Sequence, residues 1–286
     1  MAPLHSKFFR WCALGSKRDW LCNFLLGRCY MTGMGIMKSL TRGLSIIEDL
    51  ADQGNDTAQF YLGGFYTRDG PTQDHVKSEK WLRKSAMFGN TQAQMQLGMM
   101  YMRGSGLPKD IDAAVVWLRS AAEKGCASAQ MALGGIYLSG DGVASNTEEG
   151  LKWLHRSAEQ GFAQAQYVIG KLFLEMGDSL EKQQIGAEWM RKGAEGGDDD
   201  AQYMLGMLFL EGKLFAQDEH RAIEWLRKSA LQGHAKAQHA LGECHLYGQG
   251  VIPDREEALK WLSKAAEQGH PPSVMTVMAM RAEVTD

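Results

Sequence analysis

Apolar and small residues along most of this chain recur every three or four positions, which is the period of an amphipathic helix. In one clear stretch, Ala129, Leu133 and Tyr137 share a helix face, and Gly134 lies beside them. The glycine is best explained by the close approach of a second helix. Two glycines in residues 140–143 then predict a sharp reversal of the chain.

A second helical pattern follows this reversal and runs from about Thr147 to Gln160. Gly161 comes directly after it, at the position where a left-handed helix C-cap favours glycine. The inner face of this second helix carries small and bulky residues in turn, namely Gly150, Trp153, Leu154 and Ala158. The unit is therefore predicted to be a helix hairpin.

The hairpin pattern is repeated along the chain with a period of 36 residues. Three columns share this spacing: Trp81, Trp117, Trp153, Trp189, Trp225 and Trp261; Gly89, Gly125, Gly161, Gly197, Gly233 and Gly269; and the Ala-Gln pairs that start at Ala93, Ala129, Ala165, Ala201 and Ala237. Two earlier units are visible, one of them starting at Ala58 and one residue shorter. Stacked hairpins of this kind form an α-solenoid, in which each unit contacts mainly its neighbours.

The run from Ala93 to Gly106, followed by Trp117, Ala121, Ala122 and Gly125, resembles the Sel-1-like repeat, a relative of the tetratricopeptide repeat. The resemblance implies an all-α fold: a right-handed α/α superhelix (solenoid) of about seven 36-residue helix-hairpin repeats with terminal capping helices. It also implies a protein-binding role, because proteins of this family are adaptors, scaffolds, regulators and, in bacteria, sometimes immunity proteins.

The repeats predict the organisation of the chain. We expect an N-terminal capping segment at 1–21, a C-terminal capping helix at 273–286, and seven repeats at 22–57, 58–92, 93–128, 129–164, 165–200, 201–236 and 237–272. The first cap is predicted as a degenerate helix from Phe8 to Trp20. In the second, Ser273 to about Ala282, we expect Met275 and Met278 to close the last core.

Some repeats depart from the pattern. The usual Gly-x-Gly loop is replaced by residues 175–180 in one unit and by residues 212–215 in the next, which predicts two loops of different shape. The position held by Tyr137 is occupied in the next three repeats by Phe173, Phe209 and His245.

Composition and charge exclude several classes of function. With a net charge of −3 and a pI near 6.3, the chain has no bulk attraction for nucleic acid or an anionic membrane. No apolar run reaches the roughly 18–20 residues of a membrane helix, so we expect no membrane insertion. The cationic first 20 residues lack a secretory cleavage site, although an amphipathic organelle presequence stays open as an alternative. Five scattered cysteines without a CxxC pair favour a reducing cytoplasm, which we expect to be bacterial.

The sequence offers little for catalysis or metal binding. His234, His239, Glu243, Cys244 and His245 form one local group, but no HExxH or CxxC motif frames it, and His245 lies in the aromatic column. Packing explains these residues better than a metal site does. Asp198, Asp199 and Asp200 precede a helix and match its dipole. We therefore predict no enzyme, no catalytic residues, no metal and no cofactor.

The residues that vary between repeats are the candidates for specificity. Counting from the first residue of the Ala-Gln pair as zero, positions 2, 3, 6, 9 and 10 point away from the partner helix of the hairpin. By resemblance to tetratricopeptide arrays, this first-helix stripe lines the concave surface. The candidate partner-binding residues on it are Phe60, Tyr61, Arg68, Met95, Met99, Arg103, Met131, Tyr167, Lys171, Tyr203, Met204, Met207, His239 and Glu243.

Two interpretations of the stripe stay open. Its apolar members pack between neighbouring repeats, or they form an adaptable groove for a partner helix or extended segment. We predict a non-catalytic protein-interaction module that acts as an adaptor, scaffold or regulator, with the convex loops as a second candidate surface. The alternatives are an immunity protein that neutralises a toxic secreted effector domain by direct binding, and a hydrolase or metal-binding protein of the same fold. The oligomeric state is unknown.

Overall fold

The computed structural model describes residues 4–16 and 19–282, and the regular elements in these residues are all helices. Residues 1–3, 17–18 and 283–286, which belong to the two expected capping segments, lie outside the described residues. The chain divides into two compact units, residues 1–145 and residues 146–286. Each is described by itself.

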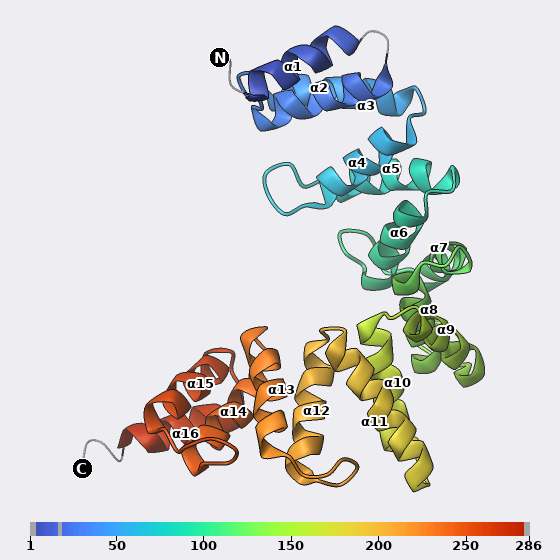
Figure 1. Cartoon of the computed structure of the whole chain (residues 1–286). Helices are drawn as coiled ribbons and strands as arrows, with labels where there is room; N and C mark the ends of the chain where they lie inside the picture. The colour runs from blue at the N-terminus through green and yellow to red at the C-terminus, as the bar shows by residue number, and fades with distance from the viewer. Residues whose placement is uncertain (1–3, 17–18, 283–286) are drawn as a thin grey trace. The chain divides into compact units, whose positions relative to one another are not determined.

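The first unit contains eight helices in its described part (Figure 1). They are α1 (Leu4–Gly15), α2 (Trp20–Thr32), α3 (Leu40–Asp52), α4 (Asp56–Thr67), α5 (His75–Met87), α6 (Thr91–Arg103), α7 (Ile111–Glu123) and α8 (Ala127–Ser139). α2/α3, α4/α5 and α6/α7 are antiparallel hairpins, and each packs on the next through its second helix.

The second unit also contains eight helices in its described part (Figure 1). They are α9 (Thr147–Glu159), α10 (Ala163–Met176), α11 (Leu180–Glu195), α12 (Asp199–Glu211), α13 (Glu219–Leu231), α14 (Ala235–Tyr247), α15 (Arg255–Glu267) and α16 (Pro271–Ala282). α10/α11, α12/α13 and α14/α15 are the hairpins of this unit. The expected all-α solenoid of repeated helix hairpins is confirmed.

In the hairpins α4/α5, α6/α7, α12/α13 and α14/α15, a glycine in the first helix faces a leucine in the second, whereas Gly27 of α2 faces Ile47 and Gly170 of α10 faces Met190. A Cβ atom on Gly63 would lie 2.6 Å from Leu82, and one on Gly98 would lie 2.6 Å from Leu118. These distances are far inside van der Waals contact, so only glycine lets the two helices approach this closely. The close approach of a second helix that the sequence predicts at this glycine of the repeat is confirmed at Gly63 and Gly98.

The Ala-Gln column links consecutive hairpins. The Nε2 amide of Gln94 donates a 2.9 Å hydrogen bond to the carbonyl of Ala86, in the last turn of the preceding second helix. Gln59, Gln130, Gln166, Gln202 and Gln238 make the same bond to Ala51, Ala122, Ala158, Ala194 and Ala230. These amides are buried, so each bond satisfies a side chain that would otherwise be costly to enclose.

The terminal helices differ from two expectations. In α16, Met275 and Met278 are 72% and 67% exposed, whereas Val277 and Met280 are buried at 6% and 5%. The expectation that Met275 and Met278 close the last core is therefore wrong, because the opposite face of the helix packs inward.

At the other end of the chain, α1 stops at Gly15, and Trp20 is the first residue of α2. A single helix from Phe8 to Trp20 is therefore also wrong. α1 leaves Leu4, Trp11 and Leu14 exposed. We keep the capping role of α1 and α16 as a proposal.

Two further features refine the repeat pattern. α10 ends at Gly177 with extended backbone, and the long helix α11 begins after only residues 177–179, so this connection differs as expected. α12 instead ends at Gly212 with φ 67°, the same left-handed cap that ends α6 and α8. In the tryptophan column, Trp81, Trp153 and Trp261 are buried, while Trp117, Trp189 and Trp225 are only half-buried.

Candidate functional site

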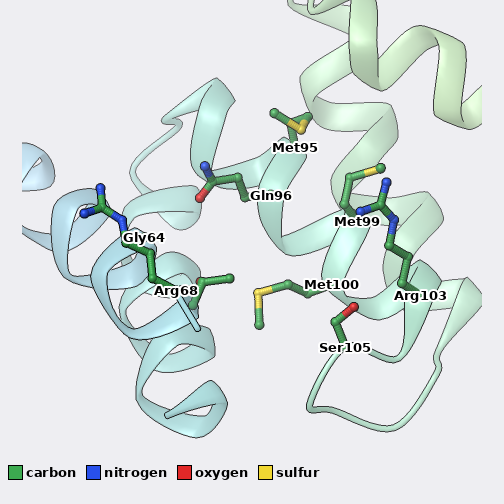
Figure 2. Close-up of a pocket in the computed structure, with 9 residues that line it drawn as sticks. Gly64, Arg68, Met95, Gln96, Met99, Met100, Arg103 and Ser105 are labelled. Carbon is green, nitrogen blue, oxygen red and sulfur yellow. The ribbon is translucent and has the colours of Figure 1, made fainter. Parts of the chain in front are cut away.

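One pocket in the first unit joins four of the candidate residues. It has a volume of about 400 Å³ and lies between α4 and α6. Figure 2 shows Arg68 on one side of this α4/α6 pocket, and Met99, Met100 and Arg103 on the other. The lining residues are Gly64, Thr67, Arg68, Met95, Gln96, Met99, Met100, Arg103 and Ser105. Arg68, Met95, Met99 and Arg103 thus come together from two consecutive repeats.

Gly64 leaves the pocket open on the α4 side. A Cβ atom built there would have no heavy atom within 4 Å apart from its own helix. The residue lies in a regular helix with a negative φ, so neither backbone conformation nor crowding requires glycine. The missing side chain therefore creates space beside the thioethers of Met95 and Met99, which are flexible enough to adapt to different shapes.

The charge in the pocket comes from Arg68 and Arg103 alone, because no carboxylate lines it. Both side chains are exposed. Within the described residues, neither guanidinium is engaged in an ion pair or hydrogen bond. Thr67, by contrast, is already satisfied, since its Oγ1 donates a 2.8 Å bond to the Gly63 carbonyl. The pocket therefore presents two available cations and an apolar wall.

The other candidate residues of the first unit do not line this pocket. Phe60 packs against the core around Leu97, and Tyr61 packs against the core around Leu62. The Tyr61 hydroxyl points to Met31 Sδ at 3.8 Å, and its ring lies 5.3 Å from that of Phe24. Met131 in α8 is half-buried.

In the second unit the candidate residues mostly pack between hairpins. Tyr167 and Met204 contact the core around Leu205, and Tyr203 and Met207 contact the core around Leu241. Burial raises the pKa of Tyr167 and of Tyr203. Lys171 forms an ion pair with Glu175 at 3.7 Å.

His239 belongs to a small polar cluster with the last helix. Ser273, which is completely buried, lies 3.0 Å from Nδ1 of His239 and 2.9 Å from Nδ1 of His270. Nε2 of His239 is 3.4 Å from Glu243, and the two imidazole rings are 4.8 Å apart. These contacts hold α16 against α14.

His234, His239, Glu243, Cys244 and His245 do not form a group of three metal-ligating side chains within the described residues. In the part of the chain that the structure describes, only Asp198, Asp199 and Asp200 bring three such groups together. Asp198 is the N-cap of α12 and accepts a 2.8 Å bond from the Ala201 amide. Cys244 is buried, and burial raises the pKa of its thiol to about 11, which disfavours the thiolate needed for nucleophilic attack. His245 is buried, and neither ring nitrogen has a hydrogen-bond partner among the described residues.

A second, more apolar pocket of about 280 Å³ lies in the second unit beside the short connection after α10. Leu151, Leu172, Phe173 and Met176 line it together with Lys182, whose ammonium pairs with Asp178 at 2.8 Å. Its charge is therefore neutralised internally, unlike that of the α4/α6 pocket.

Sequence reasoning did not single out Gly64, Thr67, Gln96 or Ser105. The available signal was the glycine at position 6, because only the repeats with Gly64 and Gly135 lack a side chain there. Whether such a glycine opens a pocket depends on which side chains of the next repeat lie across from it.

The model of the Sel1 repeat matches the chain seven times in succession, at residues 20–55, 56–90, 91–126, 127–162, 163–198, 199–234 and 235–270. The chain belongs to the Sel1 repeat family. Each match begins at the first residue of a helix, from α2 to α14, and two residues before the boundary expected from the Ala-Gln pairs. Sel1 repeats are protein-interaction modules and typically serve as non-catalytic scaffolds.

The Sel1 repeat chain is similar to proteins of known structure. It is 30% identical to a Sel1 repeat protein from Oxalobacter formigenes, with a TM-score of 0.86 over 95% of this chain and 80% of the other. It also shares its fold with the immunity protein Pa5087 from Pseudomonas aeruginosa, at 17% identity, a TM-score of 0.52, and coverage of 76% of this chain and 83% of the other.

Among curated proteins, the chain is 32% identical to rat (Rattus norvegicus) DAP3-binding cell death enhancer 1 over 74 residues. The match covers 26% of this Sel1 repeat chain and 14% of that relative, so it is confined to a small part of each. Within the described residues, no helix combines the length and apolar character needed to span a bilayer.

Proposed function

We propose that this protein is a non-catalytic adaptor, scaffold or regulator that binds a partner protein through the α4/α6 pocket. The observation that carries this proposal is the convergence of Arg68, Met95, Met99 and Arg103 from two repeats on one open pocket. The residues at these positions differ from repeat to repeat. The Trp, Gly and Ala-Gln columns instead form and connect the hairpins, and they are nearly the same in every repeat.

The contents of the pocket favour binding over catalysis. An acid–base or nucleophilic mechanism needs a group that can exchange a proton or attack near neutral pH. The lining offers two arginines, which stay protonated, together with thioethers, an amide and hydroxyls. An apolar wall with charges at its edge is instead the usual form of a protein-binding site for a helix or extended segment.

The α4/α6 pocket is also preferred over the rest of the first-helix stripe. Several other residues of the stripe pack against the cores of neighbouring hairpins and therefore expose less surface to a partner. They are Phe60, Tyr61, Tyr203 and Met207. We keep a reducing cytoplasm, in a bacterial cell, as the proposed setting; the five unpaired cysteines support it.

A matched pair of glycine substitutions tests the pocket. Gly64→Met places a side chain into the open space, whereas Gly135→Met places the same side chain at the equivalent position of α8. A Cβ atom at either site meets nothing within 4 Å, so both variants are expected to fold. Partner capture from cells that express the protein should fall at least about tenfold for Gly64→Met and stay unchanged for Gly135→Met, a difference of about 1.4 kcal/mol.

Site-specific photo-cross-linking makes the same test independent of stability. A benzophenone amino acid at Gln96 should cross-link to the partner, and one at the exposed Val116 on α7 should not. Equal cross-linking from both positions, or equal capture by both glycine variants, would show that partners bind elsewhere.

Neutralisation of a toxic effector is the alternative function. It is supported by the immunity proteins of the same fold, but the 17% identity to Pa5087 carries the fold alone. Co-expression with an effector domain encoded by a neighbouring gene decides the matter. A stable complex that abolishes the effector's toxicity would favour the immunity role, and continued toxicity would count against it.

A further inference from the structure

We infer that the α4/α6 pocket binds an acidic segment of its partner, with carboxylates at Arg68 and Arg103 and an apolar side chain between them against Met95 and Met99. This inference rests on the proposed function and adds the chemistry of the partner. Its experiment therefore separates the charge from the pocket itself.

The guanidiniums of Arg68 and Arg103 are both available to a ligand. Some arginines of this protein are engaged by carboxylates: Arg83 donates to Glu79, and Arg191 donates to Glu188 and Glu195. Arg68 and Arg103 have no such partner in the described residues, although acidic side chains are plentiful in the chain. An arginine fork matches a carboxylate in shape and charge, so a carboxylate is the natural counterpart of each.

A purely structural explanation would assign these arginines to the ends of their helices. Arg68 caps the C-terminus of α4 and Arg103 is the last residue of α6, where a cation offsets the helix dipole. However, the same register holds Thr32, Ser139, Glu175, Glu211 and Tyr247 in the other repeats. Helices of this fold therefore form without a cation there, and even with an anion.

The helix ends do not cancel the charge. Each C-terminus contributes roughly −0.5 of an elementary charge, whereas each guanidinium contributes +1. The net charge at the rim stays positive, and no carboxylate in the lining reduces it. An acidic segment is thus attracted to this pocket.

The apolar part of the pocket sets the rest of the partner's chemistry. Met95, Met99 and Met100 form the wall, and Gly64 leaves the space that an incoming side chain would occupy. A volume of about 400 Å³ accepts one or two side chains of a segment. A nucleic acid backbone is a poorer match, because two cations on a chain of net charge −3 neutralise too few phosphates.

Selection from a displayed library of random peptides tests the inference directly. The wild-type protein should enrich peptides in which Asp or Glu flanks a large apolar residue. The double variant Arg68→Gln/Arg103→Gln should lose at least about tenfold in affinity for these peptides, and their binding to wild type should weaken with salt. The control Arg10→Gln/Lys80→Gln removes the same charge from exposed positions outside the pocket and should bind like wild type.

The outcomes separate the two proposals. Enrichment of peptides without acidic residues, enrichment of none, or undiminished binding by Arg68→Gln/Arg103→Gln would overturn the acidic-segment inference. If Gly64→Met still abolishes partner binding in that case, the pocket stands as the binding site and only its charge preference is wrong. If Gly64→Met has no effect either, both proposals fail.

Discussion

At position 6 of the repeat, counted from the Ala-Gln pair as zero, α4 carries Gly64, whereas α10, α12 and α14 carry Lys171, Met207 and Glu243. In the second unit these side chains are occupied: Lys171 pairs with Glu175, Met207 packs on the neighbouring core, and Glu243 approaches His239. In the first unit the missing side chain leaves a pocket. Position 6 of the repeat is therefore engaged in contacts within the second unit, whereas at Gly64 in the first unit it leaves an open pocket.

The end of the first helix shows a second difference between the units. Arg68 caps α4 and Arg103 ends α6, and neither has an ion-pair partner among the residues that the structure describes, while α10 and α12 carry Glu175 and Glu211, which pair with lysines. The lesson is that neighbouring side chains, and not the backbone of the repeat, decide where this fold can bind.

The largest effect should come from the feature that the two units share. Gly98→Leu and Gly242→Leu should each lower the stability by about 3 kcal/mol, because a Cβ atom would lie 2.6 Å from Leu118 or Leu262. Gly64→Leu, at an open position, should be neutral or slightly stabilising, since glycine is a poor helix former. Urea unfolding followed by circular dichroism measures the three variants. Similar losses for Gly64 and Gly98 would disprove the distinction between closed and open glycines.

A smaller and equal loss is expected where the Ala-Gln column is broken. Gln94→Met in the first unit and Gln238→Met in the second should each cost about 1 kcal/mol, because a buried hydrogen bond to Ala86 or Ala230 is removed. The cost stays at the low end because both carbonyls also accept backbone amides, from Gly89 and Gly233. Urea midpoints would reveal it, and a loss in only one unit would show that the column is not used equally.

Acidification should lower the stability of the second unit, around His270, more than that of the first unit. Burial and the neighbouring His239 lower the pKa of His270 below its ordinary value of 6.5, and Lys236 and His234 act in the same direction against Glu243. The folded protein therefore resists a proton that the unfolded chain accepts. This contribution to stability is complete above pH 6.5 and is lost progressively as the pH falls below it.

Hydrogen exchange across this range measures the effect. Exchange in α16 should rise as the pH falls from 7.5 to about 5.5, after correction for intrinsic rates, whereas α4 and α6 should change little. His270→Gln should remove the difference. Equal acid sensitivity of α16 in this variant would refute the role of the histidine.

The smallest effect is expected at Lys171. Its pair with Glu175 is exposed, so Lys171→Met should change stability by less than about 0.5 kcal/mol. Its effect on partner binding should also be slight, in contrast to Arg68→Gln. A large loss of partner binding in a capture assay would extend the binding surface into the second unit.

Some details of the fold can be predicted only from the repeat register, because helical periodicity alone does not show which face of a helix is buried. Met275 and Met278 look like a core pair by spacing, but Ser273 is the residue that continues the Ala237 column, and Val277 then falls four positions later on the buried face. The candidate site was harder, because Phe60 and Met95 both read as apolar residues at position 2. One is held in a neighbouring core and the other lines a pocket.

The sequence by itself determined the helix hairpin, its period and its core, because these depend on contacts between residues close in the chain and on glycine, which alone permits the helix approach and the left-handed caps. Only the tertiary structure decided which positions of the first-helix stripe are covered. That outcome depends on how residues of consecutive repeats fit together, such as Gly64 with Met95 and Met99, which lie 31 and 35 positions further along the chain.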